Sequence, residues 1–352
     1  MRASGPIPAE TRLAAAPCPL TGKNLAAFRR ALLRWYDHHR RDLPWRKTRD
    51  PYRIWLSEIM LQQTRVAAVI DYYRSFLKRF PNVQALAATT EDAVLAAWSG
   101  LGYYHRARRL HQCAKEIVRK YRGRFPQTSE ALQTLPGLGP YTAAAIASIA
   151  FAEPVAVVDG NVERVLQRLT GLNLTTPQIW RHAQTLLASS RPGDFNQAMM
   201  ELGATVCAPR QPHCPTCPLR KWCVTQPNSP KTMERRAPSP GRTLTRNSKR
   251  RSRKEVRYVL DRRNGRIRLV QRPRKSPLMP GMWELPQLSQ MRSRTPVPVP
   301  WRTFRHSITV TDYTVHVHAA PATYGKWIPV ANIPHFPITG LTRKIFKGAG
   351  II

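Results

Sequence analysis

Four of the six cysteines of this chain lie within 17 residues, with the spacing C-x6-C-x2-C-x5-C. Four thiolates so close together, with no secretory signal before them, favour ligation of a metal or cluster over a disulfide framework. A zinc ion and an iron–sulfur cluster both accept four thiolates, so the alternatives stay open at this point. We expect a reducing, cytoplasmic compartment. The four cysteines are Cys207, Cys214, Cys217 and Cys223.

The 352 residues carry 57 Lys and Arg against 20 Asp and Glu, a formal net charge of +37. Such an excess favours polyanions through phosphate neutralisation and counterion release, so a nucleic acid is the expected partner. The longest apolar stretch, residues 143–158, is interrupted by Ser148, Glu153 and Pro154. It falls short of the roughly 18 apolar residues that a membrane span requires, and no secretion signal is expected either.

Apolar residues recur at three- and four-residue steps through much of the first 206 residues, as at Leu25, Phe28, Leu32 and Tyr36. This periodicity, with short breaks at Pro and Gly, predicts an all-α region of roughly ten helices. The length suggests about two domains. The expected divisions are a disordered extension over 1–23, a helical core over 24–206, a cysteine loop over 207–223, a basic linker over 224–254 and a final domain over 255–352.

The composition changes sharply after the cysteines. Residues 225–254 hold ten Lys or Arg, one Glu and four Pro, which is too little apolar surface to fold alone, and they predict a linker. Residues 256–260 and 266–271 are typical of short strands around the turn Arg263-Asn264-Gly265, and residues 309–318 alternate like another strand. A small α+β domain is therefore expected at the end of the chain.

The segment Leu135-Pro136-Gly137-Leu138-Gly139-Pro140 separates two helical patterns. Gly137 and Gly139 permit backbone conformations that other residues resist, and Pro140 suits the first turn of the next helix. A tight hairpin there would direct N–H groups and the positive end of a helix towards a phosphate. An ordinary turn between two helices is the alternative, and the segment alone does not decide between them.

Fourteen of the 20 acids lie in residues 24–223, so carboxylate chemistry is expected in the helical region. Glu58 follows Trp55 by three residues, and a carboxyl against an apolar face has a raised pKa, which suits a general acid near neutrality. The alternative is a glutamate that reaches solvent. Asp159 precedes a helix that begins near Gly160. It is either a structural N-cap or a carboxylate that stabilises positive charge beside a cleft.

These motifs occur in the order of the helix-hairpin-helix DNA glycosylases that carry an iron–sulfur cluster. The Glu58 helix, the hairpin, the segment Val158-Asp159-Gly160-Asn161-Val162 and the cysteine spacing together resemble that superfamily, from about residue 24 to the end. Within it, Leu43-Pro44-Trp45-Arg46 and Met60-Leu61-Gln62-Gln63-Thr64 resemble the MutY-type adenine glycosylases. The resemblance implies removal of adenine mispaired with 8-oxoguanine or guanine in double-stranded DNA.

The resemblance also implies roles for single residues. Glu58 would protonate adenine and later assist water, and Asp159 would stabilise the cationic sugar, because adenine leaves poorly until it is protonated. Relatives with lyase activity place a Lys nucleophile where this chain has Tyr141, so simple base removal is expected. The base must leave the stack to react. Tyr141 and Asn161 would lie near the reacting sugar, and Arg41, Leu43, Trp45, Arg46 and Gln197 around the flipped adenine.

By the same resemblance, Gln63, Leu101 and Tyr103 would fill or wedge the duplex beside the lesion, although a buried aromatic is the commoner role for a tyrosine. Gly137 and Gly139 would bind the DNA backbone. The four cysteines match the 4Fe–4S site of the superfamily, where the cluster organises a basic loop that meets phosphate. A structural and DNA-positioning role is expected for the cluster, since hydrolysis needs no redox step.

The final domain resembles the MutT-like domain that this family uses to recognise 8-oxoguanine, most clearly at residues 280–286. A pyrophosphatase of that fold needs a cluster of Glu side chains for divalent metal, and beyond Glu284 the only acid is Asp312, so recognition is expected rather than hydrolysis. Phe304 and His306 match a family loop that touches the oxidised base, with Ser307 as a substitute for a displaced Ser. The alternative makes Phe304 a core residue and His306 a surface one.

Two other functions stay open on the sequence alone. One is an endonuclease III-like glycosylase and lyase that acts on oxidised pyrimidines, which Tyr141 and the MutT-like appendage count against. The other is a non-catalytic basic DNA-binding protein, in which Glu58 and Asp159 could be replaced without consequence beyond stability. A monomer is expected, and the linker is open to repair-protein partners.

Overall fold

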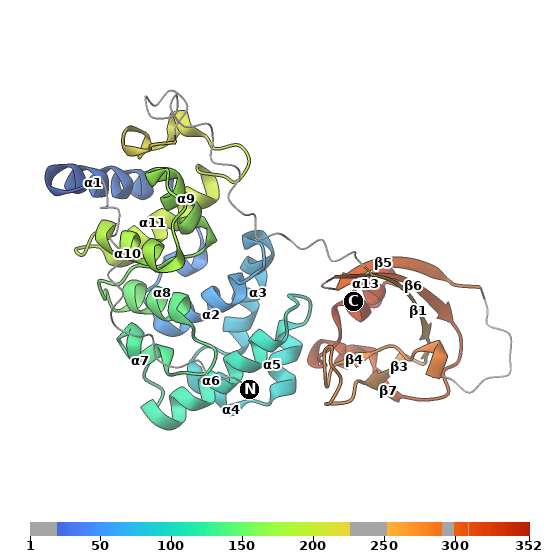
Figure 1. The fold of residues 1–352 in the computed structure, drawn as a ribbon. Helices are drawn as coiled ribbons and strands as arrows, with labels where there is room; N and C mark the ends of the chain where they lie inside the picture. The colour runs from blue at the N-terminus through green and yellow to red at the C-terminus, as the bar shows by residue number, and fades with distance from the viewer. Residues whose placement is uncertain (1–19, 226–251, 291–298, 309) are drawn as a thin grey trace. The chain divides into compact units, whose positions relative to one another are not determined.

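The computed structural model describes residues 20–225, 252–290, 299–308 and 310–352 (Figure 1). These residues form two compact units that are not continuous in the chain. The first combines residues 20–41 with 147–225, and the second combines residues 42–146 with those after 251. Most of the expected N-terminal extension and of the expected linker lies outside the described residues. The expected domain boundaries stay predictions.

The first unit is a helical body built on one apolar core. The periodic residues Phe28, Leu32 and Tyr36 are fully buried in it, as their spacing predicts. Thr175 and Gln178 cap the third of its helices reciprocally, which fixes where that helix begins. Its helices are α1 (Gly22–His39), α9 (Gly160–Thr170), α10 (Thr176–Leu186) and α11 (Pro192–Thr205).

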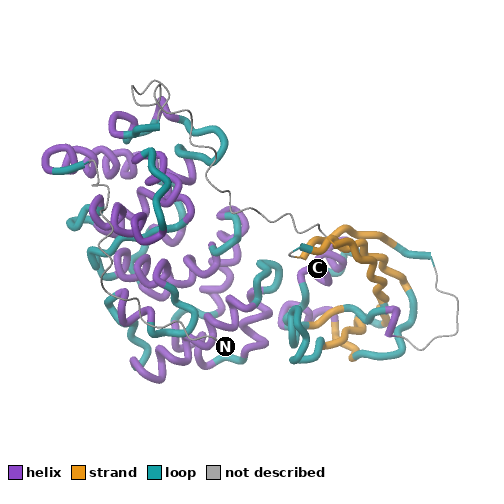
Figure 2. Tube along the Cα trace, viewed as in Figure 1, coloured by secondary structure: helices purple, strands orange, loops and turns teal. Residues whose placement is uncertain are grey.

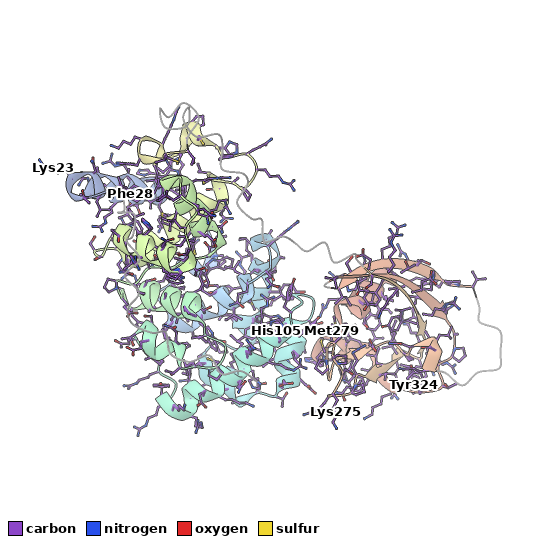
Figure 3. The ribbon with its side chains drawn as sticks, in the orientation of Figure 1. Lys23, Phe28, His105, Lys275, Met279 and Tyr324 are labelled. Carbon is purple, nitrogen blue, oxygen red and sulfur yellow. The ribbon has the colours of Figure 1, made fainter. Side chains whose placement is uncertain are left out.

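Two short 3-10 turns follow α11 and carry three of the clustered cysteines: η2 (Cys214–Thr216) and η3 (Arg220–Trp222) with the residues beside them. They pack on the first unit through Trp222, whose ring meets Phe28 edge-on with centroids 5.5 Å apart. Phe28 is labelled on α1 in Figure 3. The cysteine loop is therefore anchored by aromatic packing as well as by the chain itself.

The helical part of the second unit begins with a short 3-10 turn and continues through seven helices. Local capping explains several of the starts, because the side chains of Asn82, Thr90 and Thr128 each accept a backbone N–H at the third residue of the helix they precede. Trp55, Trp98 and Phe76 are fully buried here. The elements are η1 (Pro44–Arg46), α2 (Pro51–Leu61), α3 (Val66–Arg79), α4 (Val83–Ala88), α5 (Glu91–Trp98), α6 (His105–Tyr121), α7 (Ser129–Gln133) and α8 (Pro140–Ala150), whose last four residues belong to the first unit.

The C-terminal part is the only described region that contains strands, which are orange in Figure 2. One sheet has the order β1-β6-β5, with β1 parallel to β6 and β5 antiparallel to it. In the other sheet, β3 pairs with β2, β4 and β7. The elements are β1 (Ser252–Leu260), β2 (Arg262–Arg263), β3 (Arg266–Gln271), β4 (Trp283–Glu284), η4 (Leu288–Gln290), β5 (Arg302–Ile308), β6 (Thr311–Ala319), β7 (Lys326–Pro329), η5 (Val330–His335) and α13 (Gly340–Gly348).

The expected strands and turn of this domain are found where the sequence predicts them. Asn264 and Gly265 both have positive φ, the pattern of a tight two-residue hairpin turn. The first strand begins at Ser252, earlier than expected, because its basic first residues pair with β6 from Thr311 onwards. The α+β class of the domain is thus confirmed. No helix of the described residues is long and apolar enough to cross a membrane.

Candidate active site

Glu58 lies on α2, a helix that buries almost every residue of its second and third turns. Asp50 starts this helix by accepting the backbone N–H of Tyr52 at 2.8 Å, and Pro51 occupies its first position. Glu58 is 7% exposed. The alternative that it reaches solvent is therefore wrong, because Glu58 is buried on a helix whose neighbouring buried residues are mostly apolar.

Tyr141 connects to this carboxyl group from another helix. Its phenol, on the second residue of α8, donates a hydrogen bond of 2.7 Å to Glu58 Oε2 across 83 residues of sequence. A bond of this kind fixes the orientation of the carboxyl group. The chain thus offers a phenol, and no amine, at the start of α8.

The hairpin before α8 has the geometry that its glycines predict. Gly137 has a φ of +81°, and a Cβ atom there would lie 3.0 Å from the Cβ atom of Arg109. Gly137 and Gly139 are both exposed, whereas Leu135 before them and Leu138 between them are buried. Pro140 is the first residue of α8. The two leucines hold the hairpin on the core and leave its two glycines at the surface.

Arg106 on α6 joins the end of α2 to the loop before α6, although the sequence reasoning did not single it out. Its guanidinium is 4% exposed and also faces the ring of Tyr103 at 5.3 Å. Gln63 and Tyr103, both expected to wedge DNA, have φ values of +59° and +49° and are exposed. The N–H groups of Arg106 donate to the carbonyls of Ile59 (2.8 Å), Met60 (2.9 Å), Gln62 and Gly102 (3.4 Å) and to the hydroxyl of Thr64 (3.0 Å).

A left-handed backbone costs roughly 1 kcal/mol or more at a residue other than glycine. The hydrogen bonds from Arg106 hold the two segments, around Gln63 and Tyr103, in which the backbone is left-handed. The third expected wedge residue, Leu101, is 8% exposed and belongs to the core.

Two of the residues expected around adenine are buried in the core of their unit. Leu43 and Trp45 are 5% and 7% exposed, and the ring of Trp45 meets that of Tyr73 edge-on at 5.4 Å. Arg46 is half-buried at the end of η1. The motif thus has a packing role in this structure.

In the first unit, Asp159 is the N-cap of α9. Its Oδ1 accepts the backbone N–H groups of Asn161 at 2.9 Å and Val162 at 2.8 Å, and its Oδ2 accepts the side-chain amide of Asn161 at 2.9 Å. The structural prediction of a cap is confirmed. Both oxygens are held in place by N–H groups, and Asn161 serves to orient the carboxylate.

Arg41, expected to contact adenine, forms an ion pair that the sequence reasoning missed. Its backbone N–H, Nε and Nη2 lie 3.1, 2.7 and 2.6 Å from the carboxylate oxygens of Glu201, which is 1% exposed. The hydrogen bonds to Glu201 raise the pKa of Arg41 above its usual value. Gln197 lies one turn before Glu201 on α11 and is half-buried. The spacing of one helical turn between Gln197 and Glu201 is the sequence signal from which Glu201 could have been found.

The four clustered cysteines are half-buried and form no disulfide in the described residues. Burial is the main cause that raises the pKa of Cys217, to about 11. The neighbouring thiols of Cys223, Cys207 and Cys214 raise it as well. The thiols therefore lie close enough to influence one another. Arg168 donates to Cys207 Sγ at 3.3 Å. Within the described residues no group of three or more His, Cys, Asp or Glu has a geometry that could hold a metal ion, although a set of sulfur donors only is the set that iron–sulfur clusters and structural zinc prefer.

The residues expected to recognise the lesion lie on β5. Phe304 is 8% exposed and packs in the core of the C-terminal domain, as the alternative reading had it. His306 is half-buried, and burial with the nearby Lys344 charge lowers its pKa. Ser307 is exposed and donates to Asp312 at 2.6 Å.

Glu284, the acid within the segment that resembles a MutT-like domain, is already paired in the structure. Both of its carboxylate oxygens accept Arg272 Nη1 at 2.8 Å, and one also accepts the hydroxyl of Tyr258 at 3.2 Å. An acid neutralised in this way does not offer its charge to a divalent cation.

Figure 3 labels Lys275 and Tyr324 on the same domain, where Tyr324 donates to Gln290 at 2.7 Å.

Comparison with known proteins adds a family to this geometry. Residues 56–188 match the model of the HhH-GPD superfamily of base excision DNA repair proteins. The chain is 49% identical to the adenine DNA glycosylase of Homo sapiens over 214 residues, which are 56% of this chain and 39% of that protein. It is 40% identical to the adenine DNA glycosylase of Arabidopsis thaliana over 302 residues, 74% of this chain and 47% of that protein.

Among solved structures, a thermostable thymine-DNA glycosylase is 34% identical, with a TM-score of 0.54. The match covers 57% of this chain and 95% of that one. The chain spans less than half the length of the human and Arabidopsis proteins.

Proposed function

Because the chain belongs to the HhH-GPD superfamily of base excision DNA repair proteins and resembles its MutY-type adenine glycosylases, we propose that it removes adenine from duplex DNA by hydrolysis. The reaction breaks the bond between the base and C1′ of the deoxyribose and adds the elements of water. It leaves free adenine and an abasic site. The observation that carries the proposal is the buried carboxyl group of Glu58 with its bond from Tyr141.

Glu58 is the proposed proton donor. Adenine is a poor leaving group unless a ring nitrogen takes up a proton as the bond to the sugar lengthens, and a sheltered carboxyl group is suited to supply it. After the base departs, the same carboxylate can accept a proton from the attacking water. Tyr141 supports this role because its hydroxyl keeps the carboxyl group in one orientation.

Asp159 is the proposed stabiliser of the sugar. Loss of the base leaves positive charge on the deoxyribose ring, and a fixed carboxylate lowers the energy of that state. The three N–H donors from Asn161 and Val162 support the proposal, since a carboxylate already held in place needs no reorganisation during the reaction. Arg41, Leu43, Trp45, Arg46 and Gln197 are proposed to surround the flipped base.

We propose that base removal proceeds without cleavage of the strand. A lyase reaction needs an amine that attacks C1′ and forms a Schiff base, and the residue at the start of α8 is Tyr141. The phenol of Tyr141 is already bonded to Glu58. Strand scission should therefore require alkali after the enzymatic step.

The cysteines Cys207, Cys214, Cys217 and Cys223 are proposed to hold a 4Fe–4S cluster. The sulfur-only donor set, gathered in one short loop, supports it. The cluster would fix the loop that carries exposed Arg210, Arg220 and Lys221, which are suited to phosphate contacts. The chemistry at the base is assigned to Glu58 and Asp159.

Opposite the adenine, 8-oxoguanine is the proposed partner base, and the C-terminal domain is proposed to recognise it. The neutralised Glu284 supports recognition over hydrolysis in that domain. His306 and Ser307, on the exposed edge of β5, are the proposed contacts. Phe304 is proposed to act from beneath, by holding β5 on the core.

The test is a strand-scission assay on four duplexes that differ in one pair: adenine opposite 8-oxoguanine, adenine opposite guanine, thymine opposite guanine, and an oxidised pyrimidine opposite adenine. Product after alkali with the first two, and little before alkali, is expected. Glu58→Gln should abolish the product and retain duplex binding in a mobility shift. Glu163→Gln is the matched control, because it makes the same change at an exposed position of α9. Product from the last two duplexes alone would reject the proposal.

A further inference from the structure

The segment that leads into Asp159 belongs to no helix or sheet. Residues 152–159 form no regular element, and no strand of the described residues pairs with them. Ala156 and Val157 are nevertheless buried, at 2% and 1% exposure. Buried backbone N–H and C=O groups need hydrogen-bond partners, and outside regular structure side chains must supply them. The partners of this segment therefore decide how the chain reaches Asp159.

Asn196, on α11, supplies two of these partners. Its Oδ1 accepts the backbone N–H of Val157 at 3.1 Å, and its Nδ2 donates to the carbonyl of Val155 at 2.9 Å. The same Nδ2 also donates to Ser148 Oγ, near the end of α8, at 3.0 Å. Because the amide uses its oxygen and both of its hydrogens, it has a single orientation. Asn196 is 2% exposed, so water does not replace these bonds.

Gln184, on α10, holds the residues in between. Its Oε1 accepts the backbone N–H of Ala156 at 2.9 Å, and its Nε2 donates to the carbonyl of Pro154 at 2.8 Å. Gln184 is exposed, and water competes for its bonds. Two side-chain amides from two helices thus bind alternate residues of the segment, and the buried Asn196 makes the larger contribution.

The helix that carries Asn196 also meets the residue that follows Asp159 by two positions. A Cβ atom at Gly203 would lie 2.7 Å from the Cβ atom of Asn161, so α11 leaves no room for a methyl group beside the first turn of α9. Gly203 follows Asn196 on α11 by about two helical turns, which places both on one face of that helix. Figure 1 shows α9, α10 and α11 together in the first unit. One face of α11 therefore contacts the chain on both sides of Asp159.

We propose that Asn196 is a positioning residue for the carboxylate of Asp159. It fixes the main chain before Asp159, while the N–H groups of Asn161 and Val162 fix the side chain. A carboxylate placed in advance stabilises positive charge on the sugar without reorganisation. Asn196 is buried and acts only through Asp159. The inference rests on the proposed function only for the charge that Asp159 faces.

The first measurement needs no DNA and follows the hydrogen exchange of single backbone amides by NMR in the full chain. Asn196→Ala should speed the exchange of the Asn161 and Val162 amides, which donate to Asp159, about tenfold, the effect of about one lost hydrogen bond. Asn173→Ala is the matched control, because it makes the same change at an exposed position of the same unit.

The amide of Ile179 is the internal reference. It donates to the carbonyl of Thr175 at 2.9 Å at the start of α10, and its exchange should stay unchanged in Asn196→Ala. Equal acceleration of all three amides would show only a loss of general stability and would overturn the proposal. Unchanged exchange at Asn161 and Val162 would overturn it as well.

The second measurement compares the affinities for two duplexes that carry an uncleavable abasic-site analogue, one with a cationic pyrrolidine ring and one with a neutral tetrahydrofuran ring. The parent chain should prefer the cationic ring, because Asp159 faces it. Asn196→Ala should lower the ratio of the two affinities about tenfold, and Asn173→Ala should leave it unchanged. In an Asp159→Asn chain the ratio should already be low, and Asn196→Ala should lower it no further.

A purely structural role of Asn196 weakens the binding of both analogues alike, and an unchanged ratio in Asn196→Ala would overturn the proposal. Gln184→Ala is the second variant if Asn196→Ala does not fold, because it removes two bonds to the same segment from an exposed position. It should lower the ratio about threefold, and an unchanged ratio there would also overturn the proposal. A parent chain without preference for the cationic ring would reject the role of Asp159 in the proposed function, and the amide exchange would still decide whether Asn196 positions it.

Discussion

At the scale of single residues, the account depends on how Glu58 is held. Its carboxyl group is buried on α2 and accepts the hydroxyl of Tyr141 at 2.7 Å. A sequence can suggest that a glutamate lies against an apolar face, but it cannot show that a residue 83 positions away supplies the hydrogen bond. That pairing depends on the fold bringing the start of α8 to α2, which is a tertiary property.

The bond between Tyr141 and Glu58 can be tested by Tyr141→Phe. We expect the single-turnover rate of adenine release to fall about tenfold to a hundredfold, because a hydrogen bond to a charged group contributes roughly 1.5–3 kcal/mol. Duplex affinity should change little, since the ring remains. The double variant Tyr141→Phe with Glu58→Gln should release adenine no more slowly than Glu58→Gln alone. An unchanged rate in Tyr141→Phe would show that the phenol does not orient the acid.

Arg41 and Glu201 make a second residue-scale prediction. Arg41→Met removes the guanidinium that contacts both carboxylate oxygens of Glu201, which is 1% exposed, and we expect a loss of about 3 kcal/mol in the free energy of unfolding by urea. The double variant Arg41→Met with Glu201→Gln should recover part of that loss, because the buried charge is gone. A single variant as stable as the parent would show that the pair adds no net stability.

Elements were predictable where their signals are local. The start of α2 follows from Asp50 and Pro51, and the hairpin follows from its glycines and Pro140. The strands around Asn264 and Gly265 were predictable for the same reason. The parallel pairing of β1 with β6 was not, because it joins segments about 59 residues apart and leaves no periodic mark in either.

The N-terminus of α9 separates the structural and chemical roles of Asp159. Asp159→Asn keeps an oxygen that can cap the helix, so we expect little change in thermal stability but a large loss of adenine release. Asp159→Ala removes the cap as well and should cost about 1 kcal/mol of stability. Thermal unfolding and single-turnover kinetics measured on both variants check this. Full activity in Asp159→Asn would leave Asp159 only a structural role.

At the scale of the whole molecule, the sequence indicated the classes of structure but not how the chain is shared between units. The first unit takes α1 from one end of the helical region and α9 to α11 from the other. Apolar periodicity identifies the helices, yet it carries no information about which of them pack together. The cysteine spacing was more informative, because all its members lie in one short loop on the first unit.

The cluster can be tested through the composition of the purified protein. We expect about four iron atoms and matching acid-labile sulfide per chain. Cys217→Ala should lose most of that iron and bind duplex DNA more weakly, because the loop with Arg210, Arg220 and Lys221 loses its anchor. Cys113→Ala is the control, since Cys113 is buried outside the loop and should leave the iron content unchanged. Stoichiometric zinc in place of iron would contradict the assignment.

The most direct measurement identifies the base that the protein releases. The full chain is incubated with a duplex that contains adenine opposite 8-oxoguanine, and the free bases are separated by chromatography. We predict one adenine for each abasic site, an intact strand until alkali is added, and no free base with Glu58→Gln. Free thymine, scission without alkali, or undiminished adenine release by Glu58→Gln would contradict the account.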